Sequence, residues 1–164
     1  MKKLSFVFAF MLFTVLTIHA QAPLGKGGSQ LNAGFGFSGY GVPIYAGVDF
    51  GVSKDITLGI EGSFRSYSEY WGSATVFGFL GNFNYHFNTI MEIPSAWDFY
   101  GGFNLGFYSW SFPNDYHGSG NSGLGLGLQV GGRYFFTNKF GINLEFGGGN
   151  RISGGKIGIT YRFK

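Results

Sequence analysis

The sequence lacks cysteine entirely and contains few charged residues. None of its 164 residues is Cys, which excludes a disulfide framework and leaves no thiolate for a metal centre. Charged residues make up 12% of the chain, whereas they account for about a quarter of a typical soluble domain. Aromatic residues reach 21%, and 31 residues are glycine. Few charges combined with many aromatic side chains indicate a large apolar surface that contacts something other than water.

A strong basic excess is also missing once the N-terminus is removed. Lys2 and Lys3, the apolar run over residues 6–16 and a small residue before a cleavage position are typical of a secretory signal peptide over residues 1–20. The run is too short for a membrane helix. Without the two lysines, nine of the eleven basic residues face eight acidic ones, a net charge of about +1. Nucleic-acid binding is therefore not expected. Residues 21–30 are interpreted as a periplasmic lead-in.

The rest of the chain, residues 31–164, is built from segments in which apolar and polar residues alternate. In the last segment, for example, Ile157, Ile159 and Tyr161 share one face of a strand, and the positions between them are polar or glycine. No segment has the period of a helix. The alternation predicts an all-β fold of eight strands, at residues 31–37, 44–52, 56–66, 75–87, 97–107, 123–136, 140–146 and 156–163.

Strand length and loop length favour a membrane barrel over a soluble sandwich. Most segments have about nine to eleven residues, the length with which a tilted strand crosses a bilayer. The connections expected outside the cell are 40–43, 67–73, 109–122 and 147–155, whereas two of the three inner ones are tight turns, as in transmembrane barrels. Residues 88–96 depart from this rule. We therefore predict an eight-stranded, antiparallel, up-and-down transmembrane β-barrel over residues 31–164.

Aromatic residues gather near both ends of the predicted strands, where membrane proteins place interfacial girdles. The periplasmic group consists of Tyr85, Phe87, Trp97, Phe99, Tyr134, Phe136, Tyr161 and Phe163, and the outer group of Tyr67, Tyr70, Trp71, Trp110 and Phe112.

Charged residues of the predicted strands fall on the face opposite the aromatic one. We predict a lumen charge network of Asp49, Glu61, Arg65, Asp98, Arg133, Glu145 and Arg162. Its four acidic and three basic groups nearly cancel, and carboxylates paired with guanidinium groups satisfy one another. An eight-stranded barrel is just filled by its side chains. Inward glycines reduce this filling, while Tyr45, Tyr100, Leu80, Gln129 and Phe135 restore it.

The last strand carries a further pattern, in which a polar residue is followed by a glycine and two spaced aromatics: Lys156, Gly158, Tyr161 and Phe163. It resembles the signal that the barrel assembly machinery reads in small eight-stranded outer-membrane barrels of the OmpA and OmpX type, which are often described as porin-family proteins. The resemblance implies location in the bacterial outer membrane, contact with its lipid, and the assembly machinery as a partner during biogenesis. Lys164 follows the terminal aromatic and departs from the commonest form of the signal.

Motifs for chemistry are weak. Two G-x-G-x-x-G matches, beginning at Gly34 and Gly118, do not open a helix and are not dinucleotide sites. Some barrels of this size are enzymes that use His with Ser or Asp. The mature chain has only His86, which is expected to form hydrogen bonds in the lumen, and His117, in the Gly-containing loop 109–122. We expect no enzyme activity, no cofactor and no metal site.

The favoured function is a structural or surface-interaction role of a monomeric barrel, exerted through outer loops 67–73 and 109–122 toward an unidentified extracellular ligand. A narrow channel or small-solute porin is the alternative, motivated by the inward glycines of segment 123–136. A lipid-modifying enzyme centred on His117 is the third hypothesis.

Overall fold

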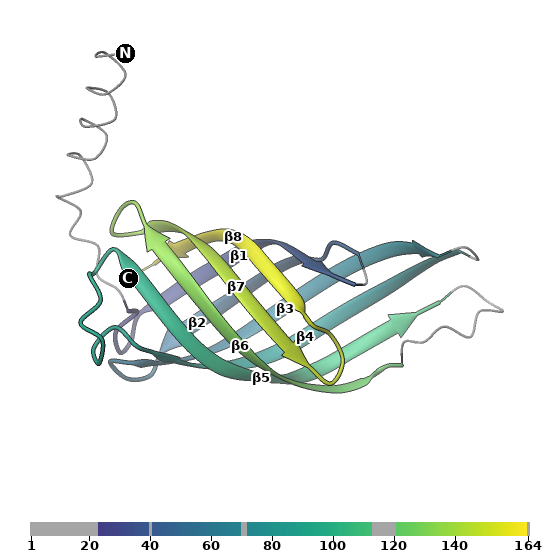
Figure 1. The fold of residues 1–164 in the computed structure, drawn as a ribbon, viewed down its shortest axis with the longest axis horizontal. Helices are drawn as coiled ribbons and strands as arrows, with labels where there is room; N and C mark the ends of the chain where they lie inside the picture. Colours follow the sequence, from purple (N-terminus) through teal and green to yellow (C-terminus); the bar gives the residue numbers. More distant parts are fainter. Residues whose placement is uncertain (1–22, 40, 70–71, 113–120, 164) are drawn as a thin grey trace, which may run out of the picture.

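Eight strands of the computed structural model pair in sequence order and close into a barrel (Figure 1). The structure describes residues 23–39, 41–69, 72–112 and 121–163. The predicted signal peptide, His117 and Lys164 lie outside these residues. The strands are β1 (Ser29–Ser38), β2 (Ile44–Gly51), β3 (Ile56–Glu69), β4 (Gly72–His86), β5 (Trp97–Ser111), β6 (Gly123–Phe135), β7 (Phe140–Gly149) and β8 (Gly154–Arg162).

Every strand is antiparallel to both of its neighbours, and the first strand closes the barrel on the last. Along this closing seam Gln30 pairs with Arg162 at one end and Ser38 pairs with Gly154 at the other. The prediction of an eight-stranded antiparallel up-and-down barrel is confirmed. In the described part of the chain, no helix has the length and apolar character needed to cross a bilayer.

The distribution of side chains is the reverse of that in a soluble protein. Leu128 on the outer face of β6 is 72% exposed, whereas Asp98 on the inner face of β5 is 0% exposed. β7 repeats the pattern, since Ile142 and Leu144 are exposed and Asn143 between them is buried. Because strand side chains alternate between faces, the sequence alternation places apolar groups outside and polar groups inside. An outer surface of this kind suits a hydrocarbon medium.

One wall of the barrel, formed by β3, β4 and β5, is taller than the rest at the outer end (Figure 1). Ladder pairing continues as far as Glu69 with Gly72 and Thr75 with Ser111. The predicted loop 67–73 is therefore wrong, because most of it is strand, and loop 109–122 begins at least three residues later than expected. Small and polar residues such as Ser66, Ser68 and Ser73 hide the pairing from an analysis based on apolar alternation.

The loop predicted before the last strand and the N-terminal lead-in also differ from expectation. β7 and β8 extend to Gly149 and from Gly154, so the predicted loop 147–155 shortens to residues 150–153. The lead-in is not a free tail, because Gly27 N–H donates to the Gly51 carbonyl at 2.8 Å and Leu24 is buried.

An aromatic girdle lies at the periplasmic end of β4 to β8. Trp97 packs against Phe99 and Tyr134, with ring centroids 5.7 and 4.6 Å apart, and Tyr134 continues to Phe136 at 5.3 Å. The predicted outer group differs, because Trp110 packs against the interior cluster of Val76, Leu80 and Tyr108. The extension of β5 places Trp110 on the same face as Tyr108. Tyr70 and Trp71 lie outside the described residues.

Tyrosine rings from β5 cover the inward glycines of β6. A Cβ atom at Gly125 would lie 2.5 Å from Cε2 of Tyr108, and one at Gly78 on the opposite side would lie 2.9 Å from Cε1 of the same ring. Carbon atoms pack at about 3.5–4.0 Å. A Cβ at Gly131 would likewise collide with the Tyr100 ring. At Gly78, Gly125 and Gly131, the missing side chain therefore makes room for an aromatic ring inside a narrow barrel.

Gly125→Val is expected to lower the free energy of unfolding by about 1–3 kcal/mol, because the ring of Tyr108 is held between two strands and cannot yield. Urea unfolding of the refolded protein measures the change. Gly62→Val is the matched control, since the nearest atom to a Cβ there is the Ala46 carbonyl oxygen at 4.0 Å. Equal losses of unfolding free energy in the two variants would contradict the packing of the Tyr108 ring against Gly125.

Candidate functional site in the barrel interior

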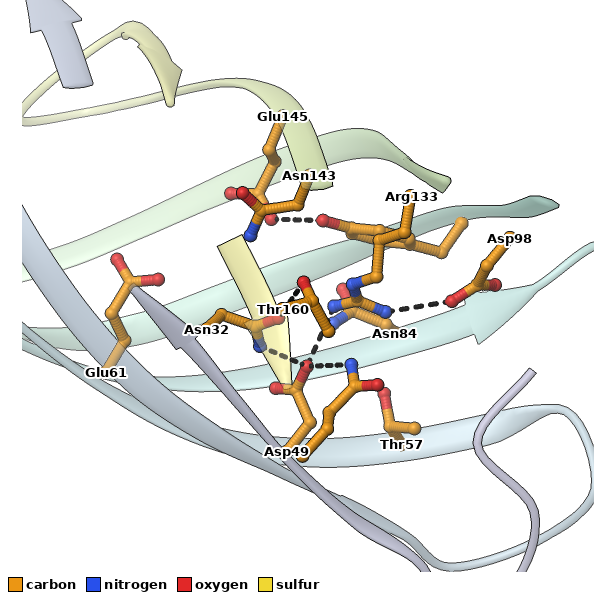
Figure 2. Close-up of polar contacts among 12 residues, drawn as sticks. Asn32, Asp49, Thr57, Glu61, Asn84, Asp98, Arg133, Asn143, Glu145 and Thr160 are labelled. Atoms are coloured by element: carbon orange, nitrogen blue, oxygen red, sulfur yellow. Dashed lines mark hydrogen bonds and ion pairs between the residues drawn. The ribbon is translucent and has the colours of Figure 1, made fainter. Parts of the chain in front are cut away.

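An arginine at the periplasmic half of the lumen joins two aspartates. Arg133 of β6 donates from Nη1 to Asp98 Oδ2 at 3.0 Å and from Nη2 to Asp49 Oδ2 at 2.8 Å, and its side chain is 2% exposed (Figure 2). Its guanidinium lies 4.2 Å from the centroid of the Tyr100 ring. Buried guanidinium–carboxylate pairs with additional hydrogen bonds are geometrically specific. Arg133 thereby connects β2, β5 and β6 across the lumen.

The hydrogen bonds continue from Asp49 into the closing seam. Gln30 Nε2 and Asn32 Nδ2 donate to Asp49 Oδ2 at 3.1 and 2.9 Å. Thr160 Oγ1 of β8 donates to Asn32 Oδ1 at 2.8 Å (Figure 2). These contacts tie β1, β2 and β8 to Arg133.

On its other side, the network reaches a histidine. His86 Nδ1 lies 2.6 Å from Asp98 Oδ1, and its Nε2 lies 3.0 Å from Thr57 Oγ1. A hydroxyl, an imidazole and a carboxylate in this order also occur in hydrolases. Here all three side chains are fully buried, so no substrate reaches the hydroxyl. The arrangement joins β3, β4 and β5.

Aromatic packing completes the base of the lumen. The Arg162 guanidinium lies 3.6 Å from the centroid of the Phe135 ring, and the Phe135 side chain is 0% exposed. A cation over an aromatic face is attracted by the ring quadrupole.

A second cluster occupies the middle of the lumen and depends on Lys156. Its Nζ lies 2.9 and 2.7 Å from the two carboxylate oxygens of Glu61 and 2.7 Å from Glu145 Oε1. Tyr100 Oη donates to Glu145 Oε2 at 2.8 Å, and Tyr45 Oη donates to Asn143 Oδ1 at 3.0 Å. The two carboxylates thus share one ammonium group.

Lys156 is absent from the charge network predicted from sequence, where it enters only as part of the assembly signal. Its inward direction was nevertheless detectable, because it lies two residues before Gly158 on the same face as Thr160 and Arg162. Among the described residues, the interior therefore contains four carboxylates and four basic side chains: Asp49, Glu61, Asp98 and Glu145 with Arg65, Arg133, Lys156 and Arg162.

The predicted lumen residues form two groups and an outer member. Asp49, Asp98 and Arg133 meet at the base, Glu61 and Glu145 meet around Lys156 in the middle, and Arg65 is buried near the outer end, where Nη1 donates to Ser38 Oγ at 2.8 Å. Figure 2 shows Asp49, Asp98 and Arg133 of the first group and the two glutamates of the second.

The predicted assembly-signal residues have different environments. Lys156 and Gly158 face inward, and a Cβ at Gly158 would lie 2.6 Å from Tyr45 Oη. Tyr161 and Phe163 are exposed on the outer surface, with ring centroids 5.5 Å apart. Their use by the assembly machinery stays a prediction.

A cavity opens near the outer mouth of the lumen. A vestibule of about 80 Å³ is lined by Arg65, Tyr108, Arg151 and the Glu61–Lys156 pair, together with glycines of β6, β7 and β8. A second cavity, between Asp49, Asn82 and Arg133, measures about 10 Å³. Of these two cavities, the one at the outer mouth is the larger.

Comparison with known proteins relates this architecture to solved structures. No protein-family model matches the sequence, and no curated protein matches it. The outer membrane protein OprG of Pseudomonas aeruginosa superposes with a TM-score of 0.65 at 10% identity, over 89% of this chain and 99% of that one. The chain has the fold of a small outer-membrane β-barrel.

Two further structures have this outer-membrane barrel fold. The N-terminal barrel domain of Pseudomonas aeruginosa OprF gives a TM-score of 0.62 at 14% identity, covering 85% of this chain and 99% of that one. Neisserial surface protein A gives a TM-score of 0.55 at 14% identity, covering 82% of this chain and 93% of that one. At these identities the likeness establishes the fold, and function has to be argued from the residues of this chain.

Proposed function

We propose that the chain is a monomeric integral protein of the bacterial outer membrane that is closed to through-flow and acts at its outer end. The apolar outer surface, the periplasmic aromatic girdle and the outer-membrane barrel fold support the location. A closed barrel satisfies its own backbone hydrogen bonds in lipid, so it needs no partner subunit to span the membrane.

The filled base of the lumen is the observation that carries this proposal. Phe135, His86 and Asp98 are fully buried there, and the ion pairs of Arg133 cross the lumen above Phe135. A hydrated ion would have to displace several of these contacts at once, each made in a low-dielectric interior.

The inward glycines that motivated a channel do not favour one. Gly125 and Gly131 lie beneath the rings of Tyr108 and Tyr100, so side chains of β5 occupy the space at these two positions of β6. We therefore prefer a surface role to a small-solute porin.

The outer end supplies a contact surface in two parts. The tall wall of β3, β4 and β5 projects beyond the other strands (Figure 1), and the vestibule beside it opens between Tyr108 and Arg151. Arg151 Nη1 donates to the Asn121 carbonyl at 2.7 Å and Nε donates to the Leu124 carbonyl at 3.1 Å, which holds the loop 150–153 against β6. Ordered polar and aromatic groups around a concavity are suited to binding a molecule from outside.

Planar-bilayer recording tests the closed lumen. The refolded protein is expected to produce no steady conductance, because the Arg133 ion pairs and the Phe135 ring occupy the base of the lumen. A porin of known conductance, inserted under the same conditions, serves as the control for detection. Reproducible openings of constant amplitude would contradict a closed barrel and favour the channel.

We propose no catalytic role for His86, since its imidazole is enclosed between Thr57 and Asp98. Cells that express the protein are expected to have lipid A of unchanged mass, measured by mass spectrometry against cells with the empty vector. A new or missing acyl chain that depends on His117 would favour the lipid-modifying enzyme.

A further inference from the structure

The periplasmic connection between β4 and β5, residues 87–96, is longer than a barrel turn needs to be. It presents two aliphatic side chains at its tip, Ile90 and Met91, which are 70% and 66% exposed. These fractions match those of the outer barrel wall, where Leu124 is 67% exposed. The described periplasmic turns at 52–55 and 136–139 are shorter.

This tip is held in a defined conformation. Met91 N–H donates to the Phe87 carbonyl at 2.9 Å, and Ile93 N–H donates to the Asn88 carbonyl at 3.0 Å. The buried Asn88 donates from Nδ2 to the Trp97 carbonyl at 2.6 Å. Thr89 Oγ1 donates to Asp55 in the neighbouring β2–β3 turn. The connection is therefore an ordered platform that displays its aliphatic groups.

Backbone geometry at the tip supports a dedicated role. Glu92, the residue after Met91, has a φ of +52°, which places a non-glycine residue in the left-handed region. Such conformations are uncommon and persist where the surrounding hydrogen bonds impose them. Here the left-handed Glu92 directly follows the two exposed aliphatic residues, Ile90 and Met91.

The tip is continuous with the aromatic girdle. Phe87, three residues before Ile90, packs on Tyr85 with ring centroids 5.4 Å apart. At the other end of the connection, Trp97 stacks on Phe99. Aromatic side chains of this kind lie at the level of lipid headgroups.

Basic residues flank the tip at the same end of the barrel. Lys26, Lys54 and Lys139 are exposed in the lead-in and the two short turns, and the carboxylates among them are Asp55 and Glu92. Lysines beside exposed aliphatic and aromatic groups are typical of surfaces that contact phospholipid headgroups and the upper acyl chains.

We propose that Ile90 and Met91 enter the inner leaflet of the outer membrane and anchor the periplasmic end of the barrel in phospholipid. The inference rests on the proposed outer-membrane location. It gives the longest periplasmic connection a partner of defined chemistry, a phospholipid surface. The anchor lies below the same strands, β4 and β5, that form the tall outer wall.

Site-directed spin labelling tests the proposal, and the absence of native cysteine makes every introduced thiol unique. Ile90→Cys and Met91→Cys are labelled with a nitroxide in the full barrel, reconstituted in phospholipid bilayers. Leu105→Cys on the barrel wall and Lys54→Cys in the β2–β3 turn are the lipid and water references. Collision rates with oxygen and with a water-soluble nickel chelate are measured by electron paramagnetic resonance, and heat-modifiable gel migration verifies folding.

The labels at positions 90 and 91 are expected to favour oxygen over the nickel chelate, as the label at 105 does. If they behave like the label at 54 while 105 remains in lipid, the anchor is overturned and the outer-membrane proposal stands. If the label at 105 is also accessible to the chelate, both proposals fail.

Discussion

Arg133→Met is expected to lower the free energy of unfolding by about 3–5 kcal/mol, the cost of leaving buried charges without their partner. Asp49 and Asp98 would remain in the lumen, 4% and 0% exposed, after losing the guanidinium that lies between them. Methionine retains much of the volume of the arginine stem, so the loss reports charge and hydrogen bonding more than packing. Urea unfolding of the refolded barrel, followed by tryptophan fluorescence, measures it.

Two further variants isolate the cause. Lys139→Met removes a cation from an exposed turn and is expected to leave stability unchanged. Combining Arg133→Met with Asp49→Asn and Asp98→Asn is expected to recover part of the loss, because neutral amides replace the two buried carboxylates that lose their guanidinium partner. A triple variant as unstable as Arg133→Met would show that shape, and not charge compensation, is the contribution of Arg133.

Phe135→Ala is the second change with a large expected effect, about 3–5 kcal/mol of unfolding free energy, as for other fully buried phenylalanines. The ring fills the base of the lumen and supports the Arg162 guanidinium at 3.6 Å. Its removal leaves a cavity that neighbouring strands, closed into a barrel, cannot collapse to fill. Equilibrium unfolding in urea measures this loss.

The next residue provides the matched control for Phe135. Phe136 belongs to the girdle on the outer surface and is exposed. Phe136→Ala removes the same atoms from a position that lipid refills, so its effect is expected to be smaller than that of Phe135→Ala. The reverse order would mean that the base of the lumen contributes little to the stability of the barrel.

Alternation of residue type was sufficient to predict the strands and the closed order of the barrel. A lipid-facing strand must keep charge on its other side, so inward charges such as Asp98 and Arg133 can be recognised from position alone. The residues with which these charges pair cannot be recognised in this way, because the pairing depends on the stagger between strands. Asp49 and Arg133 are 84 residues apart, and no local pattern brings them within 2.8 Å.

The residues that sequence reasoning missed lie where alternation is weakest. The strand predicted at residues 97–107 stops before Tyr108 and Trp110, whereas β5 continues to Ser111. Ser109 and Ser111 stand where the outer face would otherwise have apolar residues, so the alternation is lost. Lys156 was assigned to a linear signal, although its face also placed it in the lumen. The ordered connection at residues 88–96 depends on side-chain hydrogen bonds of Asn88 and Thr89, which have no periodic signature.

The contribution of β8 to the interior has a consequence for biogenesis. Lys156 compensates Glu61 and Glu145, and Thr160 joins β8 to Asn32 of the first strand. Until the final strand is in place, two glutamates already brought into the barrel lack their cation. The last strand thus completes both the closed sheet and the set of cations that face the interior carboxylates, so a barrel without β8 would also lack Lys156 and Arg162.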